Sequence, residues 1–178
     1  DVAGQLAAGN RKAGVHRVAE AVLAIQSTPV GFEVSTQAAT HSARGVVIAT
    51  GARLRPLNVP GESTYEGRGV SHCADCDAPL FAGAHVVVAG DGDWALRDAL
   101  LLAVECAEVH VVHAGAHLAA RESILARVRA QPNIHCHPNA QIEAVLVDAL
   151  AMTGVRIRHD QGPSTELPAT GLFVLVGL

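Results

Sequence analysis

The sequence has little positive charge and no cluster of it. Only 13 of its 178 residues are lysine or arginine, a single one of these is lysine, and the formal net charge is -4 at pH 7. Binding along a nucleic-acid backbone needs basic residues gathered into a run or a patch, and here they are scattered along the chain. We therefore expect no nucleic-acid partner.

Long hydrophobic runs are also missing. No apolar stretch reaches the roughly 18 residues that a membrane-spanning helix requires. The start at Asp1 shows no basic segment followed by an apolar one. With 49% hydrophobic and 17% charged residues, the composition is that of a folded globular chain. These features predict a cytoplasmic protein without a membrane partner.

Cysteine is sparse. The four cysteines are Cys73, Cys76, Cys106 and Cys136, which is too few for a secreted scaffold held together by disulfides. A close Cys-x-x-Cys pair in an intracellular chain indicates redox chemistry or metal binding. Cys106 and Cys136 stand in apolar surroundings, and we interpret them as small core residues.

From residue 85 onward, strand-like and helix-like runs alternate. Apolar runs at 85–89 and 109–112 are each followed by a helical pattern, at 93–104 and 121–130. This order is typical of a βαβ unit and a parallel sheet. Further strands are expected at 134–137, 142–147, 155–158 and 171–177. The predicted fold class is α/β, a Rossmann-like nucleotide-binding domain whose parallel sheet carries helices and a small antiparallel meander.

The N-terminal third has a different texture. A short helix is expected to end within residues 4–14, and strand-like runs follow at 15–25, 32–36 and 39–50. The last run ends in apolar residues, so we expect it to be buried on both faces. Glycine and proline crowd residues 53–69 and break regular structure there. The predicted domains are residues 1–55 and 69–178, joined by a linker over 56–68.

A glycine loop follows the strand predicted at 85–89. The loop reads Gly90-Asp91-Gly92-Asp93-Trp94-Ala95. In a dinucleotide-binding loop of this pattern the first Gly permits the turn, the second admits the pyrophosphate, and the small third residue lets helix and strand pack closely. The helix N-terminus then offers free N–H groups to the phosphates. The alternative is a glycine turn that only connects strand and helix.

The residues around this loop qualify the prediction. Trp94 is bulky where a ligand would enter, and Asp91 and Asp93 add negative charge beside a pyrophosphate. The next strand would be followed by an acidic residue for NAD or an arginine for NADP. His113 and His117 stand there instead, with Arg121 close behind. The two histidines either bind phosphate when protonated or are surface-loop residues.

The pair Cys73-Ala74-Asp75-Cys76 allows three interpretations. A disulfide fits a turn or the first turn of a helix, where the thiolate is activated and exchange can carry two electrons. Inert buried thiols are a second possibility. The third is zinc, with His72 and the two cysteines as ligands and a fourth from His135, Cys136 or His137. Asp77 follows directly and is either a proton donor or a helix cap.

Several runs, taken in order, resemble the low-molecular-weight thioredoxin reductases and the flavoprotein subunit of alkyl hydroperoxide reductase, both pyridine nucleotide-disulfide oxidoreductases. The runs are Gly45 to Ala52, Pro60 to Glu62, Gly67 to Ser71, Cys73 to Asp77 and Gly171 to Val174. The resemblance implies a nicotinamide domain inserted into an FAD domain. Residues 1–55 would then be a remnant of the FAD-binding domain, and residues 69–178 the NAD(P)-binding domain with the Cys-x-x-Cys pair.

The resemblance also implies residue roles. Cys73 and Cys76 would be the redox pair, with Asp77 as the acid. The nucleotide loop would be Gly90, Gly92 and Ala95, and the flavin surround would include Thr50 and Gly51. The family's FAD motifs would precede Asp1 and follow Leu178, and its His-Arg-Arg run is replaced by His113-Ala114-Gly115.

The expected function is that of a thioredoxin-disulfide reductase-like flavoprotein. Electrons would pass from NADP(H) or NAD(H) through FAD to the Cys73–Cys76 pair and on to a thioredoxin-like dithiol protein. The resemblance suggests a homodimer. This chain by itself is expected to be inactive. The alternative is a degenerate nucleotide-binding or regulatory homologue without reductase activity.

Overall fold

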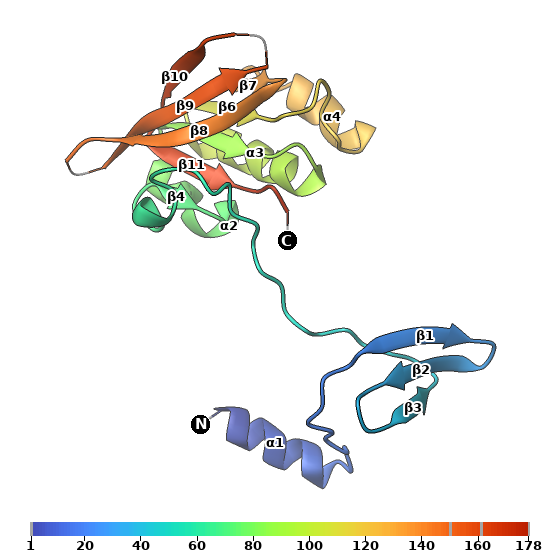
Figure 1. Cartoon of the computed structure of the whole chain (residues 1–178). Helices are drawn as coiled ribbons and strands as arrows, with labels where there is room; N and C mark the ends of the chain where they lie inside the picture. Colours follow the sequence, from blue (N-terminus) through green and yellow to red (C-terminus); the bar gives the residue numbers. More distant parts are fainter. Residues whose placement is uncertain (1, 150, 161, 178) are drawn as a thin grey trace. The chain divides into compact units, whose positions relative to one another are not determined.

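The computed structural model describes residues 2–149, 151–160 and 162–177, so residues 1 and 178, the ends of the two predicted domains, lie outside it. The chain divides into two compact units, Asp1–Gly51 and Ala52–Leu178, called unit 1 and unit 2 below. Each unit has its own sheet or sheets (Figure 1). No helix of the described part is long and apolar enough to cross a membrane.

Unit 1 consists of a helix and a small antiparallel sheet. Helix α1 is Val2–Lys12, and the strands are β1 (Ala24–Thr28), β2 (Gly31–Ser35) and β3 (Thr40–Ala43). Strands β1 and β2 form a hairpin, and β3 pairs with the other edge of β2. The helix predicted in this region and the strand predicted at 32–36 are therefore present.

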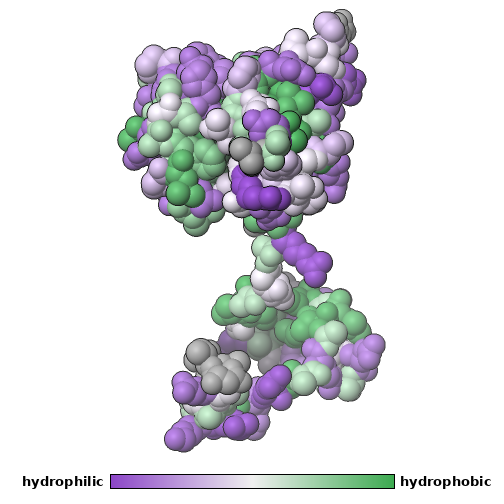
Figure 2. Space-filling model, turned by 90° about the vertical axis from the view of Figure 1, so that its left-hand side faces the viewer, coloured by the Kyte–Doolittle hydropathy of each residue, from purple (hydrophilic) through white to green (hydrophobic). Residues whose placement is uncertain are grey.

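Two other predictions for unit 1 were wrong. Residues 15–23 are not a strand, and the strand predicted over 39–50 ends at Ala43. Its apolar end is not buried, since Val47 is 91% and Ile48 72% exposed. An apolar run is buried only when a second layer covers it, and none of the unit 1 residues whose burial is described is fully buried. Figure 2 shows hydrophobic side chains on the surface of this unit.

Unit 2 is built on a parallel sheet in the order β4-β11-β5-β6-β7. Its strands are β4 (Val70–Ser71), β5 (His85–Ala89), β6 (Glu108–Val112), β7 (Ile134–His137) and β11 (Gly171–Val174). The crossovers are α3 (Asp93–Glu105) and α4 (Glu122–Arg129). The predicted βαβ order and parallel sheet are confirmed.

The two faces of the sheet are covered differently. Alternate residues of a strand point to opposite faces, so Val86 and Val88 pack with the helices while Val87 and Ala89 pack with the meander. The meander is the antiparallel sheet of β8 (Ala140–Val147), β9 (Met152–His159) and β10 (Ser164–Pro168). A meander is present as predicted and replaces helices on one face of the sheet (Figure 1). Its strands differ from the prediction, because residues 134–137 join the parallel sheet as β7 and β10 was not predicted.

The segment predicted as a linker is irregular but packed. Leu57, Val59 and Tyr65 lie against the core under the meander, and Tyr65 ends a short 3-10 helix, Ser63–Tyr65. The buried carboxylate of Glu62 accepts hydrogen bonds from the backbone N–H groups of Leu57 and Asn58 at 2.8 and 2.7 Å. These contacts hold the residues before β4 against the core of unit 2, to which they belong.

At the amino ends of the central strands, residues of the chain itself form hydrogen bonds with the backbone groups. Asn133 donates from Nδ2 to the carbonyls of Ala103 and Cys106 at 2.9 and 3.2 Å, which satisfies the end of α3. The backbone N–H of Val109 donates to the Asn133 carbonyl at 2.9 Å. Helix α3, β6 and the start of β7 are thereby joined.

Candidate functional site

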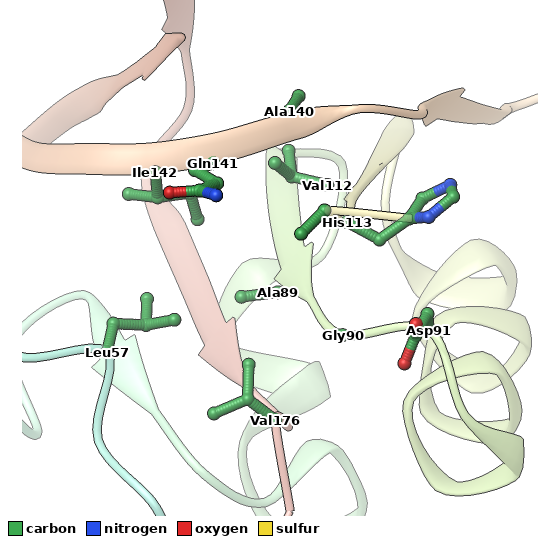
Figure 3. A pocket seen from close by; sticks show the side chains of 11 residues that line it. Leu57, Ala89, Gly90, Asp91, Val112, His113, Ala140, Gln141, Ile142 and Val176 are labelled. Carbon is green, nitrogen blue, oxygen red and sulfur yellow. The ribbon is translucent and has the colours of Figure 1, made fainter. Parts of the chain in front are cut away.

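A pocket of about 320 Å³ lies at the carboxyl ends of three neighbouring strands. It is lined by residues that end or follow β5, β6 and β11, by β8, and by Leu57 (Figure 3). Strand β5 has β6 and then β7 on one side, and on the other side it has β11, to which the chain returns later, so the strand order reverses at β5. Open α/β sheets bind ligands at this type of switch point.

Gly90 is required by packing. Its φ is +142°, and a Cβ there would lie 2.5 Å from the Leu175 carbonyl oxygen and 2.9 Å from the Cβ of Ala95. Ala95 is buried in the core beneath α3. The predicted tight turn at the first glycine and the small third residue are therefore both present in the structure.

Gly92 is surrounded by open space. It caps α3 without any side-chain hydrogen bond, and a Cβ added to it would meet no atom within 4 Å. The first N–H groups of a helix have no partner within the helix, and the helix dipole favours an anion beside them. The loop can therefore receive a phosphate at Gly92.

The two aspartates of the loop differ. Asp93 pairs with Arg121: its Oδ1 accepts from the Arg121 backbone N–H at 2.8 Å, and its Oδ2 accepts from the guanidinium. The Arg121 backbone N–H and then its side chain hold the pKa of Asp93 below its usual value. Asp91 instead lines the pocket. One of the two loop charges is thus neutralised within the chain.

His113 lies at the end of β6 and is only 4% exposed. Neither ring nitrogen has a hydrogen-bond partner among the described residues. Burial lowers the pKa of His113, and the nearby carboxylate of Asp91 partly opposes this. The surface-loop interpretation is therefore wrong for His113, which is buried, whereas His117 is exposed.

Trp94 does not line the pocket. Its half-buried ring packs against the core cluster beneath the helices. The pocket does contain residues that the sequence analysis missed: Leu57, Gln141, Ile142 and Val176. They come from distant segments and no motif marks them, so only the fold brings them together.

The cysteine pair is a disulfide. Cys73 and Cys76 are joined, with their Cα atoms 5.3 Å apart. Cys73 caps the short helix α2 (Ala74–Asp77), and the backbone N–H of Cys76 donates to its sulfur at 3.2 Å. Cys73 is half-buried while Cys76 is exposed. A partner can therefore reach Cys76, and a Cys73 thiolate would be stabilised by the N–H group.

Asp77 is held by a serine that the sequence analysis did not identify. The Ser71 hydroxyl donates to Asp77 Oδ2 at 2.6 Å and accepts from the Cys73 backbone N–H at 3.1 Å. Ser71, Asp77 and the start of the cysteine pair thus form one hydrogen-bonded network.

A second acidic group, also missed, reaches the cysteine helix from α3. Burial raises the pKa of Asp98, and a hydrogen bond from the Ala74 backbone opposes the shift. Asp98 lies five positions after Asp93 in the same helix, so α3 connects the glycine loop with the cysteine helix.

The remaining thiols do not extend the site. Cys106 is buried as predicted, and burial raises the pKa of its thiol to about 11. The core assignment was wrong for Cys136, which is exposed because β7 is the edge strand of the sheet. Within the described ranges, the predicted zinc ligands form no metal-binding cluster, and His72 instead contacts the Val174 carbonyl through Nδ1 at 3.0 Å.

The disulfide and the pocket share one edge of the sheet. Cys73 follows the carboxyl end of β4, and the pocket lies at the carboxyl ends of β11, β5 and β6. Neighbouring strands are about 4.8 Å apart, so β4 and β5, separated by β11, lie about 10 Å apart. Fold and site define a Rossmann-like α/β protein that carries a dithiol beside a dinucleotide-type loop.

Comparison with known proteins names the family. The chain belongs to the pyridine nucleotide-disulphide oxidoreductases, whose family model matches residues 7–178. It is 35% identical over 147 residues to a thioredoxin reductase of Treponema pallidum, covering 83% of this chain and 48% of the relative. It is 37% identical over 141 residues to a subunit of the alkyl hydroperoxide reductase of Pseudomonas putida, covering 79% and 27%.

Solved structures agree with this family. The thioredoxin reductase of Giardia duodenalis superposes with a TM-score of 0.76 at 28% identity, covering 98% of this chain and 57% of that one. The Lactococcus lactis enzyme gives a TM-score of 0.72 at 29% identity, covering 97% and 57%. The chain spans about half the length of the thioredoxin reductases it matches.

Proposed function

We propose that this chain is the nucleotide-binding and dithiol-bearing part of an FAD-dependent thioredoxin reductase-like oxidoreductase. The observation that carries the proposal is the common edge shared by the Cys73–Cys76 disulfide and the glycine-loop pocket. The relatives named thioredoxin reductase support it. The predicted domain roles, an FAD-binding remnant over 1–55 and an NAD(P)-binding domain over 69–178, belong to the same proposal.

The nucleotide would be NADP(H) or NAD(H), held at the carboxyl edge of the sheet. Its pyrophosphate would lie against Gly92 and the first turn of α3, where space and free N–H groups are available. The buried ring of His113 lines the same pocket, and a turn of the ring would bring one of its nitrogens to a ribose or phosphate oxygen. Gly90, which also lines the pocket, and the buried Ala95 would keep the loop in place.

Bound FAD supplies a two-electron relay between nicotinamide and disulfide. Thr50 and Gly51 would form part of its surround. They follow the exposed apolar residues Val47 and Ile48, and Gly51 has a φ of +78° that favours glycine. An exposed apolar segment of this kind fits the flat ring of a flavin.

The reduced cysteines would then pass two electrons to a thioredoxin-like protein. The exposed thiolate of Cys76 attacks one sulfur of the partner's disulfide, forms a mixed disulfide and releases one partner thiolate. Cys73, as thiolate, attacks the sulfur of Cys76, closes the disulfide and releases the second partner thiolate. Asp77, held by Ser71, would be the proton donor to a departing thiolate.

Trp94 allows a direct test of nucleotide binding, because it is the only tryptophan and lies in the loop. The full chain is titrated with NADPH and with NADH while its fluorescence is recorded. We expect at least one nucleotide to quench it, and Gly92→Ala to weaken binding by about tenfold or more, since the new methyl group occupies the phosphate's space. The matched control is Gly45→Ala, whose Cβ also meets no atom within 4 Å. Equal loss in both variants would contradict the proposed site.

The reductase activity is tested in the full-length polypeptide. The full-length protein should purify with bound flavin and should reduce a thioredoxin with either NADPH or NADH as the electron donor. Sedimentation of the same sample tests the proposed homodimer, and cell fractionation tests the proposed cytoplasmic location. A colourless protein that reduces no disulfide would overturn the assignment.

A degenerate nucleotide-binding or regulatory homologue is the second candidate. It is favoured by one observation: the guanidinium of Arg121, the basic group expected to read the ribose, is paired with Asp93. Bound flavin without response to either nucleotide would support this candidate over the reductase.

A further inference from the structure

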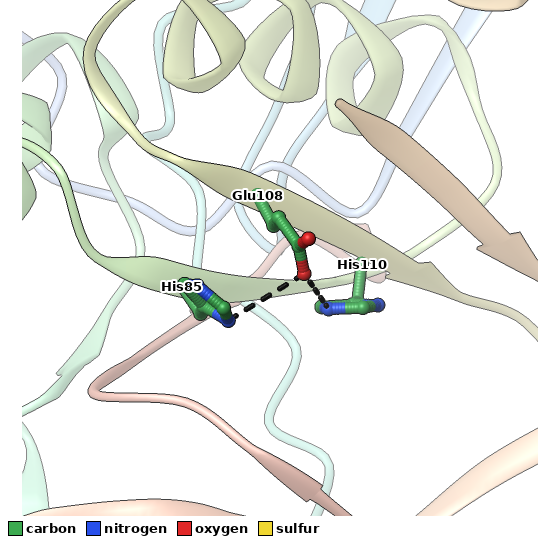
Figure 4. A group of neighbouring side chains, drawn as sticks. All are labelled: His85, Glu108 and His110. Carbon is green, nitrogen blue, oxygen red and sulfur yellow. Dashed lines mark ion pairs between the residues drawn. The ribbon is translucent and has the colours of Figure 1, made fainter. Parts of the chain in front are cut away.

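Three potential metal ligands meet at the opposite edge of the parallel sheet. His85 begins β5 and Glu108 begins β6, and the parallel register pairs these two residues directly. His110 lies two positions further along β6, so its side chain is on the same face as Glu108. Figure 4 shows both imidazoles turned toward the Glu108 carboxylate.

The distances suit a small cation. Glu108 Oε2 lies 3.5 Å from His85 Nδ1 and 3.4 Å from His110 Nε2, and all three ligand atoms lie within 4.8 Å of one another. Bonds of about 2.0–2.1 Å in a tetrahedral zinc site place neighbouring ligand atoms about 3.3–3.4 Å apart. Two of the three separations therefore already match, and the third, between the two imidazole nitrogens, is no more than 4.8 Å.

A fourth residue, His137, contacts the ring nitrogen of His110 that does not face Glu108. His110 Nδ1 and His137 Nε2 are 3.1 Å apart, so one of these nitrogens must donate and the other accept. When His110 donates, its neutral ring turns the Nε2 lone pair toward the Glu108 carboxylate, an arrangement that a cation between them would stabilise. Metal-bound histidines commonly donate their other N–H to a neighbour in this way.

We propose that His85, Glu108 and His110 form a binding site for a divalent transition-metal ion of the zinc class. Two imidazoles and one carboxylate suit zinc, whereas magnesium and calcium prefer oxygen ligands. The side chains of His85 and Glu108 are 51% and 42% exposed, so water can complete the coordination. Among the described residues, this is the only cluster of three or more such groups.

This site is separate from the proposed nucleotide pocket. Strand β5 runs from His85 to Ala89, and four steps of about 3.3 Å place its ends about 13 Å apart. The metal would cross-link the starts of β5 and β6, while the nucleotide would lie beyond their carboxyl ends. Its presence therefore does not depend on reductase activity.

Zinc binding is measured by calorimetry on the full chain with the Cys73–Cys76 disulfide intact. The chain carries Cys136→Ser, which removes the exposed thiol as a competing ligand. We expect about one Zn²⁺ per chain and a higher melting temperature with zinc. His85→Ala and Glu108→Gln should each weaken binding by about tenfold or more, and His137→Ala by about tenfold through loss of orientation. Cobalt in place of zinc should give an absorption spectrum without thiolate bands.

The matched control is His135→Ala. His135 faces His110 across the strand pair, with ring centroids 5.3 Å apart, but is no member of the cluster. We expect its removal to leave zinc affinity unchanged. Equal weakening by His135→Ala and His85→Ala would show a diffuse histidine surface and overturn the proposal. Absence of zinc binding by the parent chain, shown by circular dichroism to be folded, would overturn it as well.

Discussion

The two edges of the parallel sheet in unit 2, at the carboxyl ends and at the amino ends of its strands, differ in whether their polar groups have partners. At the carboxyl edge the chain leaves open space beside Gly92 and a histidine without partners. At the amino edge, Asn133 caps the end of α3, and His85 and Glu108 lie 3.5 Å apart across β5 and β6. Satisfied groups stabilise a fold, whereas unsatisfied buried groups cost free energy and mark positions for a ligand. The comparison therefore separates an edge proposed to bind the nucleotide from an edge whose side chains have partners within the chain.

The largest expected effect tests the chemistry of the carboxyl edge. In the full-length protein, Cys76→Ser should lower nucleotide-driven reduction of thioredoxin by about a thousandfold or more, because no disulfide can form. The rate is measured with saturating nucleotide. Cys136→Ser is the thiol control and should leave the rate unchanged. A comparable fall in both variants would remove the distinction between Cys76 and the other exposed cysteine.

Thiol labelling compares the cysteines at the two edges. At pH 8 and after reduction, the exposed Cys76 should react readily with iodoacetamide, and Cys136 more slowly than Cys76 because burial raises the pKa of its thiol. Cys106 should react about a hundredfold more slowly, because the pKa of its buried thiol is about 11 and only the thiolate reacts. Mass spectrometry of peptides over time measures the three rates. Rapid labelling of Cys106 would show that the amino edge opens in solution.

Adding one methyl group separates the two glycines of the loop. Gly90→Ala should destabilise unit 2 by about 2–4 kcal/mol, because the Cβ meets the Leu175 carbonyl and φ is positive. Gly92→Ala should change the free energy of unfolding by less than about 1 kcal/mol. Urea denaturation measures both. Equal losses in the free energy of unfolding for the two variants would contradict the assignment of Gly90 to packing and of Gly92 to the ligand.

Removing an amide tests the amino edge. Asn133→Ala should cost about 1–3 kcal/mol, because the carbonyls of Ala103 and Cys106 lose their donor. Nucleotide titration of the same variant should give an unchanged affinity. A loss of nucleotide binding without a loss of stability would reverse the roles assigned to the two edges.

The smallest effect concerns pH and His113. Its pKa in the folded chain lies below the ordinary value of 6.5, because burial disfavours the charged ring. Below pH 6.5 the unfolded chain therefore binds the proton more readily, and stability falls with falling pH by at most about 1.4 kcal/mol per pH unit from this group. His113→Gln should flatten this slope between pH 6.5 and 5 in urea titrations. An identical slope in both proteins would show that His113 is not the group responsible.

Prediction from the sequence succeeded where the signal was local. The strand at 85–89, the helix starting at Asp93 and the cysteine pair each follow from neighbouring residues. It failed at Ile48, which no second layer of unit 1 covers, and at the edge residue Cys136. The pair of Asp93 with Arg121 spans 28 residues, and no pattern in the sequence marks so distant a contact.

The position of β11 has a consequence for synthesis. This strand follows every other strand of the described residues in sequence, yet it lies between β4 and β5 and is paired with both. A ribosome must therefore release residues 171–174 before the sheet can close. Until then β5 has an open edge, and its apolar residues, Val86 to Ala89, have no partner on that side. Open apolar edges invite aggregation, so premature termination upstream of Gly171 should give insoluble protein instead of a smaller folded domain.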